Sequence, residues 1–303
     1  MDKELCGVIL INKHKGVTSH DIVFKIRRLF NTKKVGHTGT LDPLATGVLP
    51  VLIGRAAKAS EYLLSENKKY VARLRLGITT DTEDITGRVL SEFEGRLPTK
   101  EELFEACSHF VGEIKQVPPM YSALKVNGQK LVDLARQGIE VERQARDITV
   151  HSLEPEVIDE ENGIYQISVS CSKGTYIRTL CTDIGAMLGC GATMTELIRT
   201  QSGSFKIDDS YTIEELEKMS LEERASLLIS TESLFDEAQV VNLPPFYARL
   251  CRSGCEIYQK KLHTSLPLGT FVRIYDENGF FALGEVKDYP DGSAIKAVKL
   301  FVL

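Results

Sequence analysis

The residues with the clearest chemical potential lie in the segment 36–47, which reads GHTGTLDPLATG and is called the Asp42 loop below. It holds one carboxylate, Asp42, directly before Pro43. Glycine, threonine and proline are too frequent for a helix, and proline biases the residue before it towards an extended backbone. Loops on rigid scaffolds often carry catalytic groups. We therefore expect Asp42 to be presented at a fixed angle, although Asp-Pro pairs also begin ordinary turns.

Elements that would position this loop can be read from the apolar periodicity. A β-branched run over 48–53 predicts a strand directly after the loop. A helix is expected from Ser19, as its cap, to Phe30, with a basic outer face. Residues 70–76 alternate as a strand, which places Tyr70 on the face of its apolar residues.

The second half of the chain shows the same mixture of strands and helices. A strand over 164–171 leads through a Lys-Gly turn into a helix over 176–188, which carries Arg178 near its start. A short helix is expected near 56–64. Capping boxes, in which Thr or Ser precedes Glu by three residues, mark three further helix starts: Thr99 with Glu102, Thr212 with Glu215, and Ser220 with Glu223.

The C-terminal region has a different character. Residues 240–245 read as a linker, followed by a strand over 270–275, a turn over 276–279 and a partner strand over 280–284. Strands mixed with segregated helices predict an α+β fold. A chain of 303 residues accommodates two domains, and we expect them at 1–240 and 241–303.

Composition and charge narrow the class of protein. The hydrophobic content of 43% is ordinary for a globular protein, and no apolar stretch reaches the ~20 residues that cross a bilayer. The N-terminus does not read as a signal peptide, so we expect a cytoplasmic protein with its 7 cysteines reduced. Cys251, Cys255 and His263 match no common zinc spacing, and we expect no metal site.

The formal net charge of −5 hides an uneven distribution. Lysine and arginine crowd the first quarter of the chain, whereas much of the compensating acidic charge lies over 208–237. Such asymmetry favours a polyanionic partner, although solvated helix and strand faces give the same pattern.

The Asp42 loop as a whole closely resembles the signature loop of the TruB-type tRNA pseudouridine synthases, which modify uridine 55 in the T loop. Other segments resemble further blocks of this family, and they occur in the family's order: 12–21, 69–77, 80–87, 117–125 and 172–179. One residue departs from the pattern, because His14 follows Lys13 where the family usually has proline.

The resemblance implies a fold and a reaction. Residues 1–240 should adopt the pseudouridine-synthase fold, a mixed, mostly antiparallel sheet with flanking helices. Residues 241–303 should form a small β-rich, PUA-like RNA-binding module, for which a generic small β barrel is the alternative. The implied reaction breaks the N1–C1′ bond of a flipped-out uridine, rotates the base and rejoins it through C5.

The same resemblance implies which partners and cofactors to expect. The partner is the T arm of tRNA, with no membrane, no obligate protein partner and no guide RNA. The reaction needs no metal, nucleotide or redox cofactor, and the sequence has neither a Walker loop nor a dinucleotide fingerprint.

Catalytic roles are implied for three residues. Asp42 corresponds to the essential aspartate, acting as a nucleophile or as a base at the sugar. Arg178 is expected to pair with Asp42, to keep it ionised and to lower its pKa. The ring of Tyr70 is expected to rest against the target base, with its hydroxyl near C5.

Substrate-binding roles are implied for a second set of residues. His37 should fill the gap left by the flipped nucleotide. Leu197 and Arg199 fall where the family has an apolar wall and a nearby basic residue. Tyr121 and Lys125 are expected in the cleft or on the RNA surface.

Two other functions remain open at this point. One is a tRNA-binding or folding factor whose catalysis is lost or incidental. The other is an enzyme of the guide-RNA-dependent, dyskerin-type branch. Residues 44–47 resemble the stand-alone form, which favours an enzyme that acts without a guide.

Overall fold

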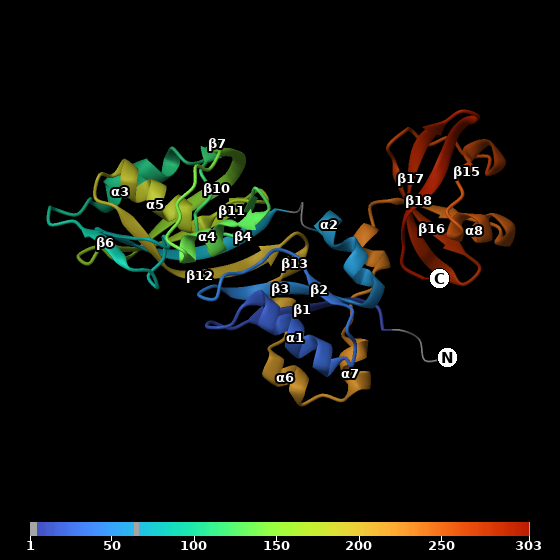
Figure 1. The fold of residues 1–303 in the computed structure, drawn as a ribbon, viewed down its shortest axis with the longest axis horizontal. Coiled ribbons are helices and arrows are strands. Elements are labelled where there is room, and N and C mark those ends of the chain that lie inside the picture. Colours follow the sequence, from blue (N-terminus) through green and yellow to red (C-terminus); the bar gives the residue numbers. More distant parts are fainter. Residues whose placement is uncertain (1–4, 64–66, 303) are drawn as a thin grey trace.

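A computed structural model describes residues 5–63 and 67–302. Within these residues the chain forms a nine-stranded sheet and a five-stranded sheet, which lie towards opposite ends of an elongated molecule (Figure 1). The larger sheet carries the Asp42 loop, and the smaller one is C-terminal. None of the helices in this part of the chain is long and apolar enough to span a bilayer.

The larger sheet is mixed and mostly antiparallel, as expected. β12 runs parallel to β3 and antiparallel to β4, so it joins the N-terminal strands to the rest of the sheet. Along the main path the strands are β1 (Gly7–Lys13), β3 (Thr46–Ile53), β12 (Ala192–Ser202), β4 (Lys68–Leu76), β11 (Ile164–Cys171), β10 (Arg146–Asp159) and β7 (Gly112–Gln116), with β2 (Val35–His37) beside β3 and β13 (Phe205–Lys206) beside β12. The predicted α+β class is confirmed.

Helices cover this sheet at both ends. α1 (Ser19–Leu29), α6 (Ile213–Glu217) and α7 (Leu221–Ser226) lie beside β1 and β3, while α3 (Lys100–Ser108) and α5 (Ile177–Met187) lie beside β10 and β12 (Figure 1). The short segments η1 (Gly54–Ala59) and α2 (Ser60–Leu63) stand where one helix over 56–64 was expected, and residue 64 lies outside the described residues. Three 3-10 turns complete this set: η2 (Ile207–Asp209), η3 (Glu232–Phe235) and, in the C-terminal part, η4 (Gln259–Lys261).

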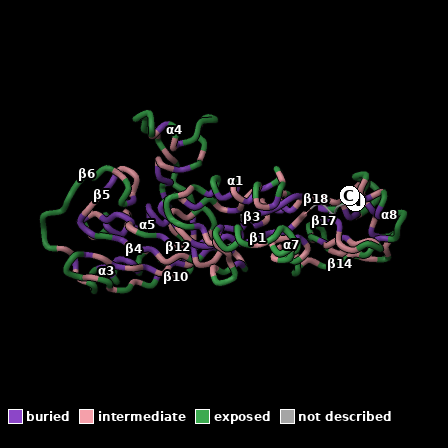
Figure 2. The backbone as a smooth tube through the Cα atoms, turned by 90° about the horizontal axis from the view of Figure 1, so that it is seen from below, coloured by how far each residue is buried: buried purple, intermediate pink, exposed green. Residues whose placement is uncertain are grey.

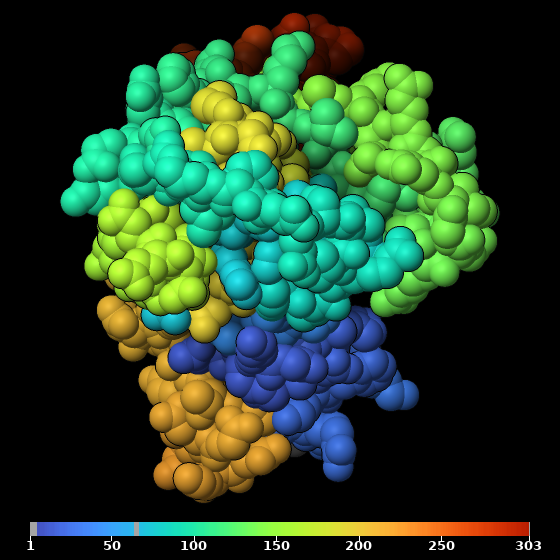
Figure 3. Space-filling view, turned by 90° about the vertical axis from the view of Figure 1, so that its left-hand side faces the viewer, coloured from blue at the N-terminus to red at the C-terminus, as the bar shows by residue number. Residues whose placement is uncertain are grey.

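Two small hairpins extend from this body. The first pairs β5 (Ile78–Thr80) with β6 (Val89–Glu92), and its segment covers one end of the molecule (cyan in Figure 3). The second pairs β8 (Lys125–Val126) with β9 (Gln129–Lys130) and leads into α4 (Leu131–Arg136). Figure 2 shows that α4 projects away from the buried strands of the sheet.

The predicted helix caps were right except at one position. The capping boxes at Thr99, Thr212 and Ser220 are confirmed. The expectation that Ser19 caps α1 is wrong, because the cap is Thr18, whose side chain accepts from the backbone of Asp21. Ser19 is instead buried and binds the Asp42 loop, as described below.

The smaller sheet is built around a hairpin. Its strands, in spatial order, are β14 (Gln239–Asn242), β16 (Phe271–Asp276), β17 (Gly279–Tyr289), β18 (Gly292–Leu300) and β15 (Ile257–Tyr258), with α8 (Pro245–Arg252) packed on them. The expected linker over 240–245 is wrong, since β14 pairs in parallel with β16. The two prolines of this segment stand at the start of α8 and do not form an irregular connection. Proline is tolerated there because the first N–H groups of a helix have no partner within the helix.

An apolar contact joins the two sheets. β1 is buried on both faces: Ile9 and Ile11 belong to the core of the larger sheet, whereas Val8 and Leu10 belong to a cluster that also contains Leu283 and Phe301. Because side chains alternate along a strand, this single strand contributes to both clusters.

Candidate active site

A pocket of about 470 Å³ opens between the Asp42 loop, the strands β4 and β12, the start of α5 and the segment 121–124. It is large enough for a nucleoside-sized ligand. Of the residues singled out from the sequence, those that line it are Asp42, Tyr70, Tyr121, Arg178, Leu197 and Arg199. These residues are far apart in the chain, and the order of the strands brings them together.

Hydrogen bonds from two sides hold the Asp42 loop. The hydroxyl of Ser19 accepts from the backbone N–H of Leu41 at 2.8 Å and lies 3.1 Å from its carbonyl oxygen. On the other side, the buried Arg199 donates to the carbonyl oxygen of Gly39 at 2.9 Å and to that of Val48 at 2.8 Å. The backbone on both sides of Asp42 is therefore fixed by buried groups.

The end of the loop requires glycine. Gly47 has φ of +103°, and a Cβ atom there would lie 2.2 Å from the carbonyl oxygen of Arg199. Only a residue without a side chain permits this close approach of β3 to β12. The approach places the loop directly against the strand that carries Leu197 and Arg199.

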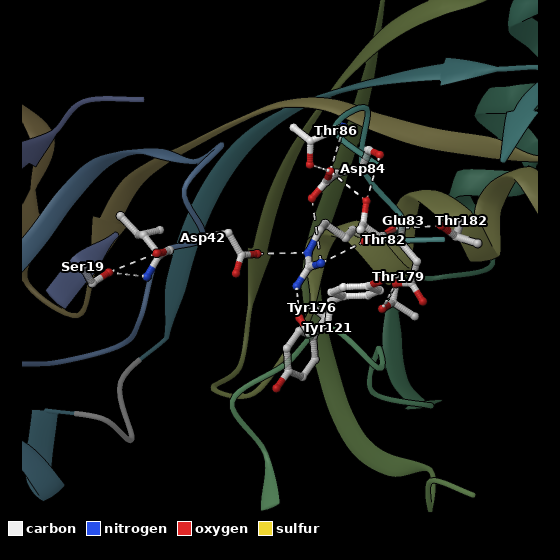
Figure 4. Close-up of polar contacts among 12 residues, drawn as sticks. Ser19, Asp42, Thr82, Glu83, Asp84, Thr86, Tyr121, Tyr176, Thr179 and Thr182 are labelled. Carbon is white, nitrogen blue, oxygen red and sulfur yellow. Dashed lines mark hydrogen bonds and ion pairs between the residues drawn. The ribbon is translucent and has the colours of Figure 1, made fainter. Parts of the chain in front are cut away.

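Asp42 and Arg178 form the expected ion pair. The Nε atom of Arg178 lies 3.0 Å from Oδ2 of Asp42, and the arginine side chain is only 5% exposed. Its remaining nitrogens donate to the carbonyl oxygens of Thr82 at 2.9 Å and Tyr121 at 2.8 Å. The guanidinium is thus bound in several directions, which fixes the carboxylate that it faces (Figure 4).

A second carboxylate approaches the same guanidinium. Oδ2 of the buried Asp84 lies 3.9 Å from Nη1 of Arg178, and Asp84 points at the site from a different side than Asp42 does (Figure 4). Its other oxygen accepts from the backbone N–H of Thr86 at 2.9 Å and from the Thr82 hydroxyl at 3.0 Å. Sequence reasoning missed this role, although the Thr-rich surroundings of Asp84 indicate a carboxylate with local partners.

Arg178 acts to lower the pKa of Asp42, as expected, but it does not decide the net shift. The Asp42 side chain keeps 38% exposure. Burial nevertheless raises the pKa of Asp42 above the ordinary value of 3.8, because the surrounding protein penalises the charged form. The positive charge of Arg178 acts in the opposite direction, while the negative charge of Asp84 adds to the rise. Asp42 therefore binds a proton at a higher pH than a free aspartate does.

The strands β4 and β12 contribute an aromatic and an aliphatic side chain to the pocket lining. Tyr70 on β4 is directly paired with Arg199 on β12, and Leu197 lies two residues before Arg199 on the same strand. Burial raises the pKa of Tyr70, with Arg199 acting in the opposite direction, so the phenol keeps its proton at neutral pH. A planar ring bound here would meet a phenol and an aliphatic side chain close to the carboxylate.

Lys13, one of the basic residues of the first quarter of the chain, is a further charged residue near the site. It is fully buried, and its ammonium group donates to the carbonyl oxygens of Val17 at 2.8 Å and His14 at 3.1 Å. Burial lowers the pKa of Lys13 to about 8, and the charge of Asp42 opposes that shift. Lys13 thus contributes to the electrostatics of the pocket and not to an RNA-facing surface.

Two predicted substrate-binding residues do not line the pocket. His37 lies on β2, where burial lowers its pKa, and its buried Nδ1 atom has no hydrogen-bond partner among the described residues. Lys125 is exposed on β8, beside the projecting α4 segment. Each is close in sequence to a lining residue, because Gly39 and Leu124 line the pocket.

Known proteins resemble this chain over most of its length. The model for the TruB family pseudouridylate synthase (N terminal domain) matches residues 27–177, and that for the tRNA pseudouridylate synthase B C-terminal domain matches residues 178–236. The tRNA pseudouridine synthase B of Clostridium perfringens (strain 13 / Type A) is 44% identical over 298 residues, which are 98% of this chain and 99% of the relative. That of Francisella tularensis subsp. novicida is 43% identical and covers 93% of this chain and 91% of the relative.

Solved structures share the fold. An H/ACA RNP bound to a substrate RNA containing 2′-deoxyuridine includes a chain that matches with a TM-score of 0.70 and 26% identity, covering 98% of this chain and 85% of that one. A Cbf5-Nop10-Gar1 complex gives a TM-score of 0.69 and 27% identity, with the same coverage of 98% and 85%. The predicted pseudouridine-synthase fold is confirmed.

Proposed function

The chain belongs to the TruB family of pseudouridylate synthases, and from this premise we propose that it converts uridine 55 in the T loop of tRNA to pseudouridine. It is a tRNA pseudouridine synthase, an enzyme of the isomerase class, because substrate and product contain the same atoms. The relatives named tRNA pseudouridine synthase B support tRNA as the substrate. The T loop and position 55 rest on the resemblance of the Asp42 loop.

The observation that carries this proposal is the ion pair of Asp42 and Arg178 inside a pocket that also holds Tyr70. In the reaction the N1–C1′ bond breaks, the base turns, and a C5–C1′ bond forms. The proton on C5 then leaves, and N1 gains a proton, so the atoms balance. An ionised Asp42 serves as a nucleophile or as a base at the sugar, and Arg178 keeps its oxygen aimed into the pocket.

The other pocket residues act on the base and the RNA. Tyr70 and Leu197 receive the flipped base between them, and the Tyr70 hydroxyl lies near C5, the atom that must lose its proton. Arg199 holds the Asp42 loop in place through the carbonyl oxygens of Gly39 and Val48. His37 fills the space from which the nucleotide has swung, while Tyr121 and Lys125 contact the RNA around the pocket mouth.

The two parts of the chain have different tasks in this proposal. Residues 1–240 carry out catalysis, and residues 241–303 act as a PUA-like RNA-binding module. The enzyme works in the cytoplasm on the T arm alone, without a guide RNA or an obligate protein partner. The high identity to tRNA pseudouridine synthase B along nearly the whole chain supports this stand-alone mode.

The test uses purified protein and an unmodified tRNA transcript carrying tritium on C5 of its uridines. We expect tritium release, because C5 must lose its hydrogen, and a single pseudouridine mapped to position 55. A transcript with cytidine at that position is the control and should release no tritium. Tight binding without product would support the binding-factor alternative, and product only after addition of a guide RNA would support the guide-dependent one.

A further inference from the structure

Three consecutive residues of the loop 80–87 contact α5, one through its backbone and two through their side chains. The carbonyl oxygen of Thr82 accepts from Arg178, the carboxylate of Glu83 accepts from the Thr179 hydroxyl at 2.5 Å, and Asp84 faces Arg178 again at 3.9 Å. Figure 4 shows Thr82, Glu83 and Asp84 gathered beside Thr179. Glu83 thus binds the helix at the residue directly after the arginine.

The backbone at Glu83 takes a conformation that favours glycine. Its φ is +64°, in the left-handed region that residues with a Cβ atom rarely adopt. A glycine would adopt this φ without steric strain, whereas glutamate keeps it against that strain and uses its side chain to bind Thr179. The turn lets Thr82 and Asp84 on either side of it both face Arg178.

Other bonds hold this loop to the sheet but not to the helix. The N–H of Met194 on β12 donates to the carbonyl oxygen of Glu83 at 3.3 Å, and the N–H of Ile85 donates to that of Met194 at 2.8 Å. Within the loop, the Thr80 hydroxyl donates to the carbonyl oxygen of Asp84 at 2.7 Å. Apart from the Glu83–Thr179 bond, the polar contacts from residues 82–84 to α5 in the described structure all go through Arg178 itself.

Glu83 also supplies a charge that the helix lacks. The first turn of α5 has no acidic residue, and its N-cap, Tyr176, makes no side-chain capping bond. A carboxylate placed there from a neighbouring loop complements the positive end of the helix dipole. The Glu83–Thr179 contact therefore stabilises both the turn and the start of the helix that bears Arg178.

We propose that Glu83 and Thr179 are positioning residues for pseudouridine formation, because their hydrogen bond locks residues 82–84 onto α5 and so holds the Arg178 guanidinium against Asp42. This inference rests on the proposed function for its catalytic consequence. Neither residue lines the pocket, so both act through Arg178 and not on the base.

The first measurement compares Thr179→Val with Thr179→Ser. Valine keeps the shape of threonine and removes the donor, whereas serine keeps the donor. We expect Thr179→Val to lower the single-turnover rate about tenfold, the size of one hydrogen bond to a charged group. Its Kd for tRNA should stay within about twofold, and Thr179→Ser should keep the wild-type rate. A loss shared equally by both variants, or a rate loss matched by weaker binding, would overturn the proposal.

The second measurement does not depend on activity. The Nε–H resonance of Arg178, assigned by its loss in Arg178→Lys, reports how firmly the guanidinium is held. We expect slow hydrogen exchange in the wild type and in Thr179→Ser, and at least tenfold faster exchange in Thr179→Val and Glu83→Ala. Unchanged exchange in both of these variants would contradict the locking role. If the wild type forms no pseudouridine, the proposed function fails while this experiment still decides the inference.

Discussion

Tyr70 and Arg199 occupy directly paired positions on the antiparallel strands β4 and β12, and both line the pocket. Arg199 also binds the carbonyl oxygens of Gly39 and Val48, which lie before and after Asp42 in the chain. Tyr70 and the Asp42 loop are therefore linked by one buried side chain. Their relative position is set by strand pairing and not by the loop alone.

Replacing Arg199 should loosen this link. Arg199→Met keeps the apolar stem but leaves two buried carbonyl oxygens without a donor, so we expect a loss of about 2–4 kcal/mol in the free energy of unfolding. Urea unfolding followed by circular dichroism measures it. The exposed Lys125→Met is the matched control, with a change within about 0.5 kcal/mol. Equal stability of the two variants would show that Arg199 does not hold the loop.

Asp42→Asn should separate binding from chemistry. The amide has the size of the carboxylate but is neither a nucleophile nor a base, so product should vanish while the Kd for tRNA changes less than about threefold. Filter binding and tritium release measure the two quantities on one preparation. Turnover near the wild-type level would remove Asp42 from the mechanism.

Arg178→Lys should lose most of the activity although the charge remains. One ammonium group cannot reach Asp42, the Thr82 carbonyl and the Tyr121 carbonyl in the geometry that the guanidinium satisfies. We expect the single-turnover rate to fall about 100-fold, as for the loss of a preorganised catalytic group. The conservative exchange Arg73→Lys, at a half-exposed ion pair, is the control and should be neutral. Comparable rates for the two variants would refute the positioning role of Arg178.

The pH dependence of the rate should reveal the raised pKa of Asp42. The ionised form is active, and a pKa above 3.8 means that the carboxylate becomes protonated, and the rate falls, at a higher pH than for an ordinary aspartate. Lys13→Met removes a positive charge that lowers the pKa of Asp42, so the acidic limb should move to still higher pH. Lys13→Arg keeps the charge and should not move it. Single-turnover rates from acidic to neutral pH test this, and a limb unmoved by Lys13→Met would contradict it.

Local sequence patterns predicted much of the fold. The strands around Tyr70 and after the Asp42 loop, and the capping boxes of three helices, follow from side-chain periodicity and short-range capping. The predictions that were wrong concern segments whose structure depends on residues far away in the sequence. The run before Pro244 and Pro245 reads as irregular until β16 pairs with it, and Ser19 resembles a cap until Leu41 is seen to bind it.

The site shows the same division. The pairing of Asp42 with Arg178 was expected from the family resemblance and is present. The net rise in the pKa of Asp42 was not expected, because it is dominated by burial, and several elements far apart in the chain together bury this residue. Asp84 and Lys13 were missed as members of the site because a charged residue in a sequence reads as exposed until its burial is known.

The apolar cluster shared by β1 and the C-terminal sheet has a mechanical consequence. Because Val8 and Leu10 pack in one cluster with Leu283 and Phe301, the C-terminal sheet is anchored to the larger sheet and is not a loosely tethered domain. Removing the C-terminal sheet would expose the apolar side chains of Val8 and Leu10 to solvent and promote aggregation. The distance between the C-terminal sheet and Asp42 is therefore governed by apolar packing against β1, and not by the length of a connecting segment.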